Sequence, residues 1–421
     1  MTTPPHDTRT RFVLRFGPQR MALLLWVLYA ALVVVSRLHL EPSPGNVFHI
    51  YKQAAHAWID GESLYAGGRF HYLPVSALVF LPWTELSFTL GGALWRLLNL
   101  AIFAIGVRQL AALVRDGRDR ELSTAFLTVS AFAIALSWSA ARHGQATLAM
   151  GGLMLMALSG IARNRTWSPV VALALAICSK PLAVILLPLV ILLQPKQALR
   201  YASAVALVLL IPFAFQSAPF VLEQYLQIPE TLRAHADSTR IKLFNDAFSW
   251  LHLLGLELEA PARFVIRSIV ALGVAALSLE AWKLLGSRQA VLLVATFAFS
   301  GILLLCPGTE SNSYALLAPL MGALFVVSKR DKDVLGQLTL VTAVLLFLVN
   351  HRLVGAYPNT ALGMVKPLAA MLVVSVALRR TPLWLELSAG FRSASLRPRW
   401  RPHKRLPDSG EAVPVKSAEG T

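Results

Sequence analysis

Basic and amide side chains stand at a few isolated points of an otherwise apolar sequence. Lys180 lies in the middle of a long apolar run, where an ammonium group is costly unless it is paired or hydrated, so it is a functional candidate. Arg142, His143 and Gln145 precede another apolar stretch, and a helix N-terminus is a favourable place for an anion. These donors suit a phosphate group. The alternatives are a structural lysine that reaches interfacial water and a solvated turn.

Carboxylates able to accept a proton are few among the apolar segments. Glu310 lies in a short polar turn close to Asn312, whose amide could bind a hydroxylated substrate. Asp60 lies at the end of an amphipathic segment, one residue before Gly61. We expect Glu310 to sit in the drier place, which favours it modestly over Asp60 as a general base. The alternative for Glu310 is structural: it pairs with Arg352 or caps a helix.

Composition places the elements that carry these residues in a membrane. The hydrophobic fraction is 56% and only 14% of residues are charged, whereas a soluble chain carries about 25% charged residues. The net charge of +17 comes mostly from short loops and the two tails, so it is a topology signal and does not indicate nucleic acid. Cys178 and Cys306 show neither metal-site nor disulfide spacing, and we interpret them as structural.

The sequence therefore predicts an all-α polytopic membrane protein with about 10–12 transmembrane or re-entrant helices. Residues 1–20 form a cytoplasmic segment, 21–378 the membrane domain and 379–421 a basic cytoplasmic tail that we expect to be disordered. Within the membrane domain, 39–71 and 217–262 are predicted to be long external loops. With this orientation, almost every polar cluster outside the cytoplasmic charge runs falls on the external side.

Two stretches depart from a simple crossing. The stretch 168–194 has basic residues at both ends and Lys180-Pro181 at its middle, which predicts a hairpin of two short helices with Lys180 near the outer tip. The stretch 72–86 contains two prolines and is predicted to be a short re-entrant or broken piece on the external side. The alternative for 72–86 is a true span that breaks the charge rule.

An amphipathic helix is predicted in the first external loop, from Asn46 as N-cap to Asp60, with Gly61 as the C-terminal stop. We expect it to lie in the membrane interface with its aromatic face towards lipid. It serves either as an anchor or as a lid for a substrate with a lipid tail and a polar head. The apolar face holds Phe48, Tyr51, Ala55, Trp58 and Ile59, and the polar face holds His49, Gln53, His56 and Asp60.

Several short motifs follow one another in a characteristic order. They are Asn46 to Tyr51, Gly61-Glu62-Ser63-Leu64-Tyr65, His71-Tyr72-Leu73-Pro74, Leu81-Pro82, Leu94-Trp95-Arg96-Leu97-Leu98-Asn99, Gly144-Gln145, Ser179-Lys180-Pro181 and Glu310-Ser311-Asn312-Ser313-Tyr314. In this order and spacing the sequence resembles glycosyltransferase family 87, over roughly residues 20 to 380. That family includes cell-envelope mannosyltransferases that use polyprenol-phosphate mannose.

The resemblance implies a GT-C fold and transfer of a sugar, mannose or a similar hexose or pentose, from a polyprenyl-phosphate donor to a lipid-linked or cell-envelope acceptor. It implies the bacterial inner membrane, an extracytoplasmic active site, and neither a metal nor a cofactor besides the donor. Lys180, Arg142 and His143 would hold the donor phosphate, Gln145 and Asn312 would orient sugar hydroxyls, and Asn46, His49 and Tyr51 would belong to the first-loop part of the substrate site.

The general base is the point at which this sequence departs from the family. Family members carry an aspartate early in the first external loop as the base, but the stretch Asn46 to Tyr51 has no carboxylate here. Two other functions therefore stay open: a transporter or flippase of lipid-linked sugars, and a catalytically silent relative. Inverted repeats would favour transport, and none is visible in the sequence. The remaining candidates for the base are Asp60, Glu62, Asp246 and Glu310.

Overall fold

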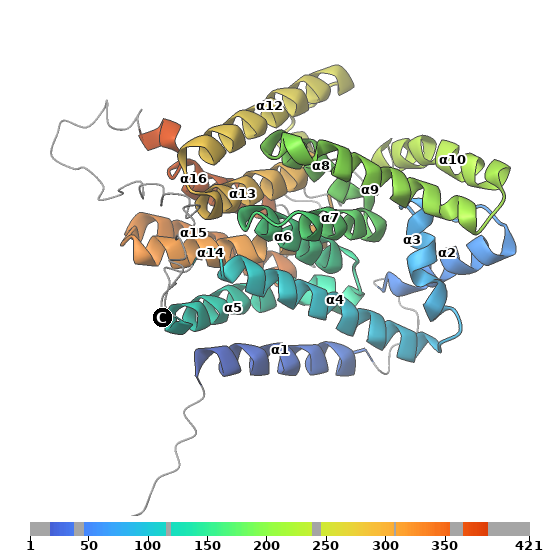
Figure 1. The fold of residues 1–421 in the computed structure, drawn as a ribbon, viewed down its shortest axis with the longest axis horizontal. Coiled ribbons are helices and arrows are strands. Elements are labelled where there is room, and N and C mark those ends of the chain that lie inside the picture. Colours follow the sequence, from blue (N-terminus) through green and yellow to red (C-terminus); the bar gives the residue numbers. More distant parts are fainter. Residues whose placement is uncertain are drawn as a thin grey trace, which may run out of the picture.

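The fold is helical throughout the part of the chain that can be described. The computed structural model describes residues 17–37, 46–114, 119–237, 246–306, 309–353 and 365–385. Over these residues the chain forms helices and no strand (Figure 1), which confirms the predicted all-α class. Disorder was expected from 379 onward, but residues 379–385 are ordered: Arg380 hydrogen-bonds to Ser328 and Thr381 is buried. Residues 386–421 lie outside the described residues.

The described elements are α-helices and short 3-10 helices. The α-helices are α1 (Pro18–Val35), α2 (Phe48–Asp60), α3 (Pro74–Phe80), α4 (Phe88–Ala111), α5 (Asp119–His143), α6 (Thr147–Ala162), α7 (Trp167–Ser179), α8 (Leu186–Leu193), α9 (Ala198–Leu210), α10 (Ala218–Asp237), α11 (Ala247–Leu253), α12 (Ala260–Leu284), α13 (Ser287–Leu305), α14 (Ala318–Arg330), α15 (Val334–Leu353) and α16 (Val365–Leu378). Short 3-10 helices are η1 (Leu81–Trp83), η2 (Pro181–Ile185), η3 (Pro195–Gln197), η4 (Ile211–Ala214) and η6 (Ser311–Leu317).

Seven helical stretches in the described chain are long and apolar enough to cross a membrane, and six shorter apolar helices accompany them. The protein is therefore a polytopic membrane protein, as composition predicts. The short helix Pro74–Trp83 rises about 15 Å, half of the hydrocarbon core, so the predicted break within 72–86 is present. The seven long stretches are Pro18–Val35, Phe88–Ala111, Ser123–His143, Pro195–Ala214, Ala260–Leu284, Ser287–Leu305 and Ser311–Arg330.

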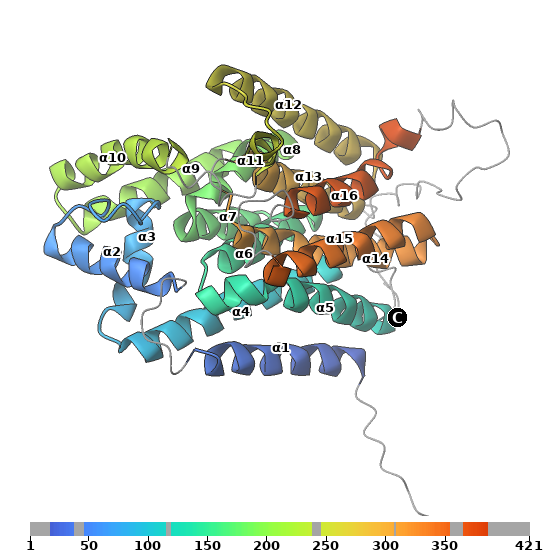
Figure 2. The ribbon, with the colours of Figure 1, turned by 180° about the vertical axis from the view of Figure 1, so that it is seen from behind.

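Glycines let the central helices approach closely. A Cβ atom added to Gly152 on α6 would lie 2.6 Å from the Ile102 carbonyl oxygen on α4, and one added to Gly106 would lie 2.5 Å from the Gly152 carbonyl oxygen. On α14, a Cβ atom at Gly322 would lie 2.8 Å from the Cα atom of Val129 on α5. Small residues at such crossings allow backbone contact between membrane helices. The interior of the bundle thus brings α4, α5, α6 and α14 together (Figure 2).

The aromatic face of α2 packs against protein, which corrects the expected lipid contact. Phe48, Tyr51 and Trp58 are almost fully buried in an apolar cluster with residues of α3, α4 and α10. Gln53, His56 and Asp60 of the polar face are exposed, whereas His49 is half-buried, and Ile59 of the predicted apolar face is exposed. The helix begins at Phe48 and not directly after Asn46, and Gly61 ends it with φ +69° as predicted.

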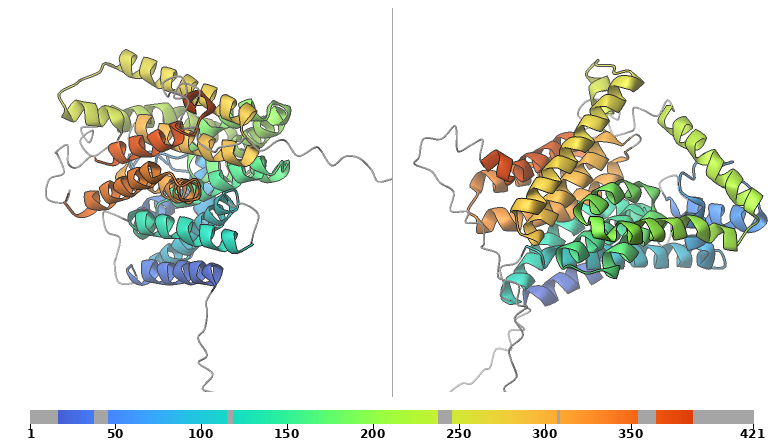
Figure 3. Two further views of the ribbon diagram at one scale, coloured as in Figure 1. Left: turned by 90° about the vertical axis from the view of Figure 1, so that its left-hand side faces the viewer. Right: turned by 45° about the horizontal axis from the view of Figure 1, so that its top comes forward.

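The predicted external loop 217–262 is largely helical and packs on the first loop. The backbone N–H of Leu64 donates a hydrogen bond to Gln224 Oε1 on α10 at 2.9 Å. Gln216, just before α10, donates from Nε2 to the Trp58 carbonyl oxygen at 2.7 Å. The views in Figures 1 and 3 agree that α2, α3 and α10 gather at one end of the bundle, on the right in Figure 1. We call this the Gly144 end, because the turn between α5 and α6 lies there at Gly144.

The segment from α7 to α8 folds back on itself. The α7 helix lies beside α6, and Lys180, which follows it, reaches Thr147 at the first residue of α6. The chain then returns, because Arg200 at the start of α9 lies over the ring of Trp167 at 5.3 Å. The predicted hairpin with Lys180 at its tip is present, with the tip at the Gly144 end. The side of the membrane that this end faces stays a prediction.

Basic and acidic residues meet at the opposite end of the bundle. The Arg380 guanidinium, just after α16, pairs with Asp331 at 2.6 Å and with Asp333 at 3.3 Å. The tail that holds Arg380 and the loop between α14 and α15 that holds Asp331 and Asp333 are both predicted to be cytoplasmic. Their contact agrees with a place on the same side of the membrane.

Candidate active site

A carboxylate and an amide from distant parts of the sequence meet at the Gly144 end. Glu310, the residue before η6, accepts a hydrogen bond through Oε2 from Gln145 Nε2 at 3.0 Å. Gln145 is buried, whereas Glu310 is exposed. The expectation that Glu310 lies in a partly dry place is therefore wrong. Its exposed carboxylate is instead open to a substrate while the buried amide holds it in place.

Lys180 points its ammonium group towards the same place. Its backbone is extended between α7 and η2, because Pro181 begins a new helical turn there. The Nζ atom donates to Thr147 Oγ1 at 3.1 Å, on the first turn of α6. The negative charge of Glu310 acts on this ammonium, but no salt bridge joins these two described residues. Lys180 therefore keeps donor capacity for another anion.

Two tyrosines form the wall beside this group. The Tyr51 hydroxyl lies 3.0 Å from the Tyr72 hydroxyl and accepts a hydrogen bond from the Ala146 N–H at 3.2 Å. The Tyr51 ring stacks on Phe80 with centroids 4.3 Å apart. Burial raises the pKa of Tyr51 to about 12, which keeps the phenol neutral near pH 7. The first-loop helix α2 thus reaches the α5–α6 turn through one aromatic side chain.

The turn that carries Glu310 is held from two other helices. Ser139 on α5 donates to Asn312 Oδ1. Lys366 on α16, buried, donates to the Ser311 carbonyl oxygen at 2.9 Å and also contacts the Ser311 hydroxyl. Asn312 therefore points towards α5 in this structure, and Lys366 fixes the residue that follows the carboxylate.

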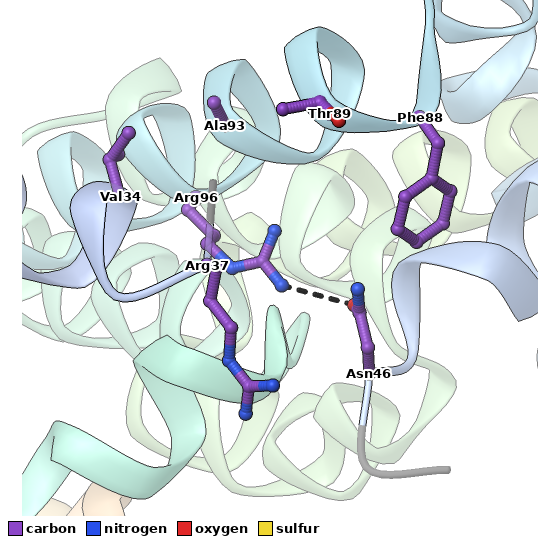
Figure 4. A pocket seen from close by; sticks show the side chains of 7 residues that line it. All are labelled: Val34, Arg37, Asn46, Phe88, Thr89, Ala93 and Arg96. Carbon is purple, nitrogen blue, oxygen red and sulfur yellow. Dashed lines mark hydrogen bonds between the residues drawn. The ribbon is translucent and has the colours of Figure 1, made fainter. Parts of the chain in front are cut away.

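A second, basic group is formed by Arg37 and Arg96 beside Asn46 (Figure 4). The guanidinium of buried Arg96 donates to Asn46 Oδ1 at 3.0 Å and to the Arg142 carbonyl oxygen at 3.1 Å. Arg37 Nη2 lies 3.5 Å from His143 Nδ1. Desolvation, and then the nearby Arg142 charge, lower the pKa of Arg37, as expected where cations gather. The cavity between Arg37, Asn46 and Arg96 is ≈ 10 Å³, about the space of one water molecule, so it is too small for a phosphate.

Arg142, at the end of α5, belongs to the basic group. Its guanidinium lies over the Trp138 ring, 5.9 Å from the centroid. Its Nε atom is buried and has no hydrogen-bond partner within the described parts of the chain. A buried donor of this kind carries a free-energy cost unless a ligand satisfies it.

Several candidate residues lie apart from Glu310 or have a structural partner. Asp60 and Glu62 are exposed at the far end of α2. Asp246 is buried and accepts from the Ser249 N–H at 2.8 Å as the N-cap of α11, which is a folding role. His49 Nδ1 contacts the Asn46 carbonyl oxygen. The side chain of Arg352, the alternative partner of Glu310, lies outside the described residues.

Sequence reasoning did not single out Arg96, Lys366 and Tyr72. For the first two a signal existed: each is a charged residue within an apolar helix, and the argument that selected Lys180 applies to them equally. Tyr72 carried no such signal, because an aromatic residue in an apolar segment looks like core.

Comparison with known proteins identifies the family. The model of glycosyltransferase family 87 matches residues 70–308, more than half of the chain. No curated protein matches the sequence. The match includes Arg142, Gln145 and Lys180 and ends two residues before Glu310. The chain belongs to glycosyltransferase family 87, a family of membrane glycosyltransferases.

Proposed function

We propose that the protein transfers a sugar from a polyprenyl-phosphate donor to a lipid-linked or cell-envelope acceptor, on the extracytoplasmic face of a bacterial inner membrane. The observation that carries this proposal is the meeting of Glu310, Gln145 and Lys180 at the Gly144 end. A proton acceptor and a cation around one exposed place are what glycosyl transfer from a phosphate requires.

In the proposed reaction the acceptor hydroxyl oxygen forms a bond to the anomeric carbon of the donor sugar. The bond between that carbon and the phosphate oxygen breaks, and its electron pair leaves with the polyprenyl phosphate. Glu310 takes the proton of the hydroxyl. The Gln145 amide, which holds one carboxylate oxygen at 3.0 Å, orients the carboxylate as a general base must be oriented.

The cationic side chains supply the stabilisation of the leaving phosphate. Lys180 is at the tip of the α7–α8 hairpin, beside the first turn of α6, where the helix dipole adds to its positive charge. Arg142 and His143 end α5 just before Gly144, and Arg142 has a buried donor to offer. The polyprenyl chain would follow the apolar helix surfaces that face lipid.

Glu310 is a better candidate for the base than Asp60. Glu310 interacts electrostatically with Lys180 and hydrogen-bonds to Gln145. Asp60 is at the opposite end of α2 from Tyr51's contact with Ala146 and is exposed to solvent. A base has to lie within hydrogen-bond reach of the reacting hydroxyl, and of these two carboxylates Glu310 has Lys180 close by.

The test of this proposal is release of free polyprenyl phosphate. Purified protein would be reconstituted with membrane lipids and given a polyprenyl-phosphate sugar labelled in the sugar. We expect label to move into an acceptor lipid or glycan, with one free polyprenyl phosphate formed for each transferred sugar. Movement of intact donor across the bilayer without its cleavage would show a transporter. Neither cleavage nor movement would show a silent relative.

A further inference from the structure

A large polar cavity lies between the first loop and α10, outside the group around Glu310. Its volume is ≈ 620 Å³, within the range of about 300–1,000 Å³ of small-molecule sites. One wall comes from residues 63–71 and the other from α10. A hydrogen bond from Ser63 Oγ to Gln227 Oε1, 2.7 Å long, joins the two walls. The lining residues are Ser63, Tyr65, Ala66, Gly67, Gly68, Arg69, His71, Gln227, Glu230, Thr231 and Ala234.

The cavity lining carries one positive and one negative side chain that do not pair with each other. Arg69 and Glu230 both line it, and neither forms a salt bridge with any residue that the structure describes. A carboxylate accepts hydrogen bonds from neighbouring hydroxyls, and a guanidinium donates to hydroxyl and ether oxygens. Arg69 and Glu230 together leave the lining without a net formal charge, so it favours neither an anion nor a cation, and a lipid tail would desolvate the polar lining. The lining therefore fits an uncharged polyhydroxylated ligand.

The cavity is connected to the candidate active site through one pair of side chains. Tyr65, in the cavity wall, donates from its hydroxyl to the Tyr72 carbonyl oxygen at 2.9 Å. The Tyr72 hydroxyl in turn contacts Tyr51 at 3.0 Å, and Glu310 acts electrostatically on both tyrosines. Tyr72 thus joins the cavity wall to the candidate active site.

We propose that this cavity binds the inner sugar units of an oligosaccharide acceptor, while the acceptor's reacting hydroxyl extends past the half-buried Tyr72 to Glu310. This inference rests on the proposed function and narrows the acceptor to one that carries several sugar units. Arg69 and Glu230, both exposed in the lining, hold the hydroxyls of these units.

Two variants probe the cavity without touching the residues around Glu310. Gly67→Trp fills it: a Cβ atom at Gly67 meets no atom within 4 Å, and its φ is not in the left-handed region. Glu230→Gln removes the charge at nearly constant volume. Glu259→Gln, at an exposed acid before α12 that does not line the cavity, is the matched control.

The experiment measures binding of mannotriose and xylotriose, as hexose and pentose probes, to the full-length protein in lipid nanodiscs by calorimetry, without donor. We expect binding of at least one probe, abolished by Gly67→Trp, unchanged by Glu259→Gln, and weakened by Glu230→Gln about tenfold to a hundredfold, as for one lost hydrogen bond to a charged group. Absence of binding to the wild-type protein, or equal binding to wild type and Gly67→Trp, would overturn the inference. The inference would also be overturned if neither trisaccharide bound and glycerol phosphate did, with tighter binding of glycerol phosphate to Glu230→Gln. Normal trisaccharide binding without donor cleavage would instead contradict the proposed function and leave this site standing.

Discussion

Single residues decide whether the group at the Gly144 end can perform glycosyl transfer, and Lys180 is the most direct to test. Losing one charge-assisted hydrogen bond to a phosphate costs about 1.5–3 kcal/mol, so Lys180→Ala should weaken donor use about ten- to a hundredfold. Lys180→Arg should be milder because it keeps the charge. Steady-state kinetics with varied donor measures this. Lys196→Ala, at an exposed lysine in η3 at the other end of the hairpin, should change nothing. Unaltered donor kinetics in Lys180→Ala would refute the phosphate role.

Lys366 positions the turn that carries Glu310. It holds Ser311, the residue after Glu310, so Lys366→Met should lower kcat about tenfold, the effect of roughly 1.4 kcal/mol, while the KM for donor stays near the wild-type value. Lys366→Arg should recover part of the loss. A parallel rise in donor KM, or a loss explained fully by lower thermal stability, would assign Lys366 to folding only.

Helices and their crossings set the distances between these residues. Gly152→Ala places a Cβ atom 2.6 Å from the Ile102 carbonyl oxygen, so α4 and α6 must move apart. We expect a loss of about 1–3 kcal/mol, as for other overpacked interiors. Gly273→Ala on α12, where a Cβ atom meets nothing within 4 Å, should be neutral or slightly stabilising. Thermal unfolding in detergent measures both variants, and equal midpoints would contradict the close approach of α4 and α6.

For the helices and their contacts, some features could be predicted from the sequence and others could not. The hairpin with Lys180 at its tip was predictable, because charge at both ends of 168–194 and Pro181 in the middle allow few other paths. The surface that covers α2 could not be predicted, because the apolar face that holds Phe48 and Trp58 has the same sequence pattern whether lipid or protein covers it. The contact between Gln145 and Glu310 joins residues far apart in sequence, and no pattern in one sequence specifies such a pair.

For the whole molecule, the prediction concerns the side of the membrane. Cysteine in place of Gly67, exposed at the Gly144 end, and of Lys196, exposed at the opposite end, should behave in opposite ways in a background lacking Cys178 and Cys306. An impermeant maleimide added to intact spheroplasts should label Gly67→Cys and spare Lys196→Cys until the membrane is opened. The reverse pattern would place the candidate site in the cytoplasm and contradict the extracytoplasmic reaction.

The central claim is that Glu310 is the base of a glycosyl transfer at the Gly144 end. The measurement that tests it most directly is transfer of labelled sugar by folded Glu310→Gln and Asp60→Asn, with donor binding determined in parallel. The account predicts that Glu310→Gln binds donor normally and loses at least about a hundredfold in turnover, the low end of what acid-base groups contribute, while Asp60→Asn stays near the wild-type rate. Near-native turnover in Glu310→Gln would contradict the account, and a selective loss in Asp60→Asn would move the base to the first loop.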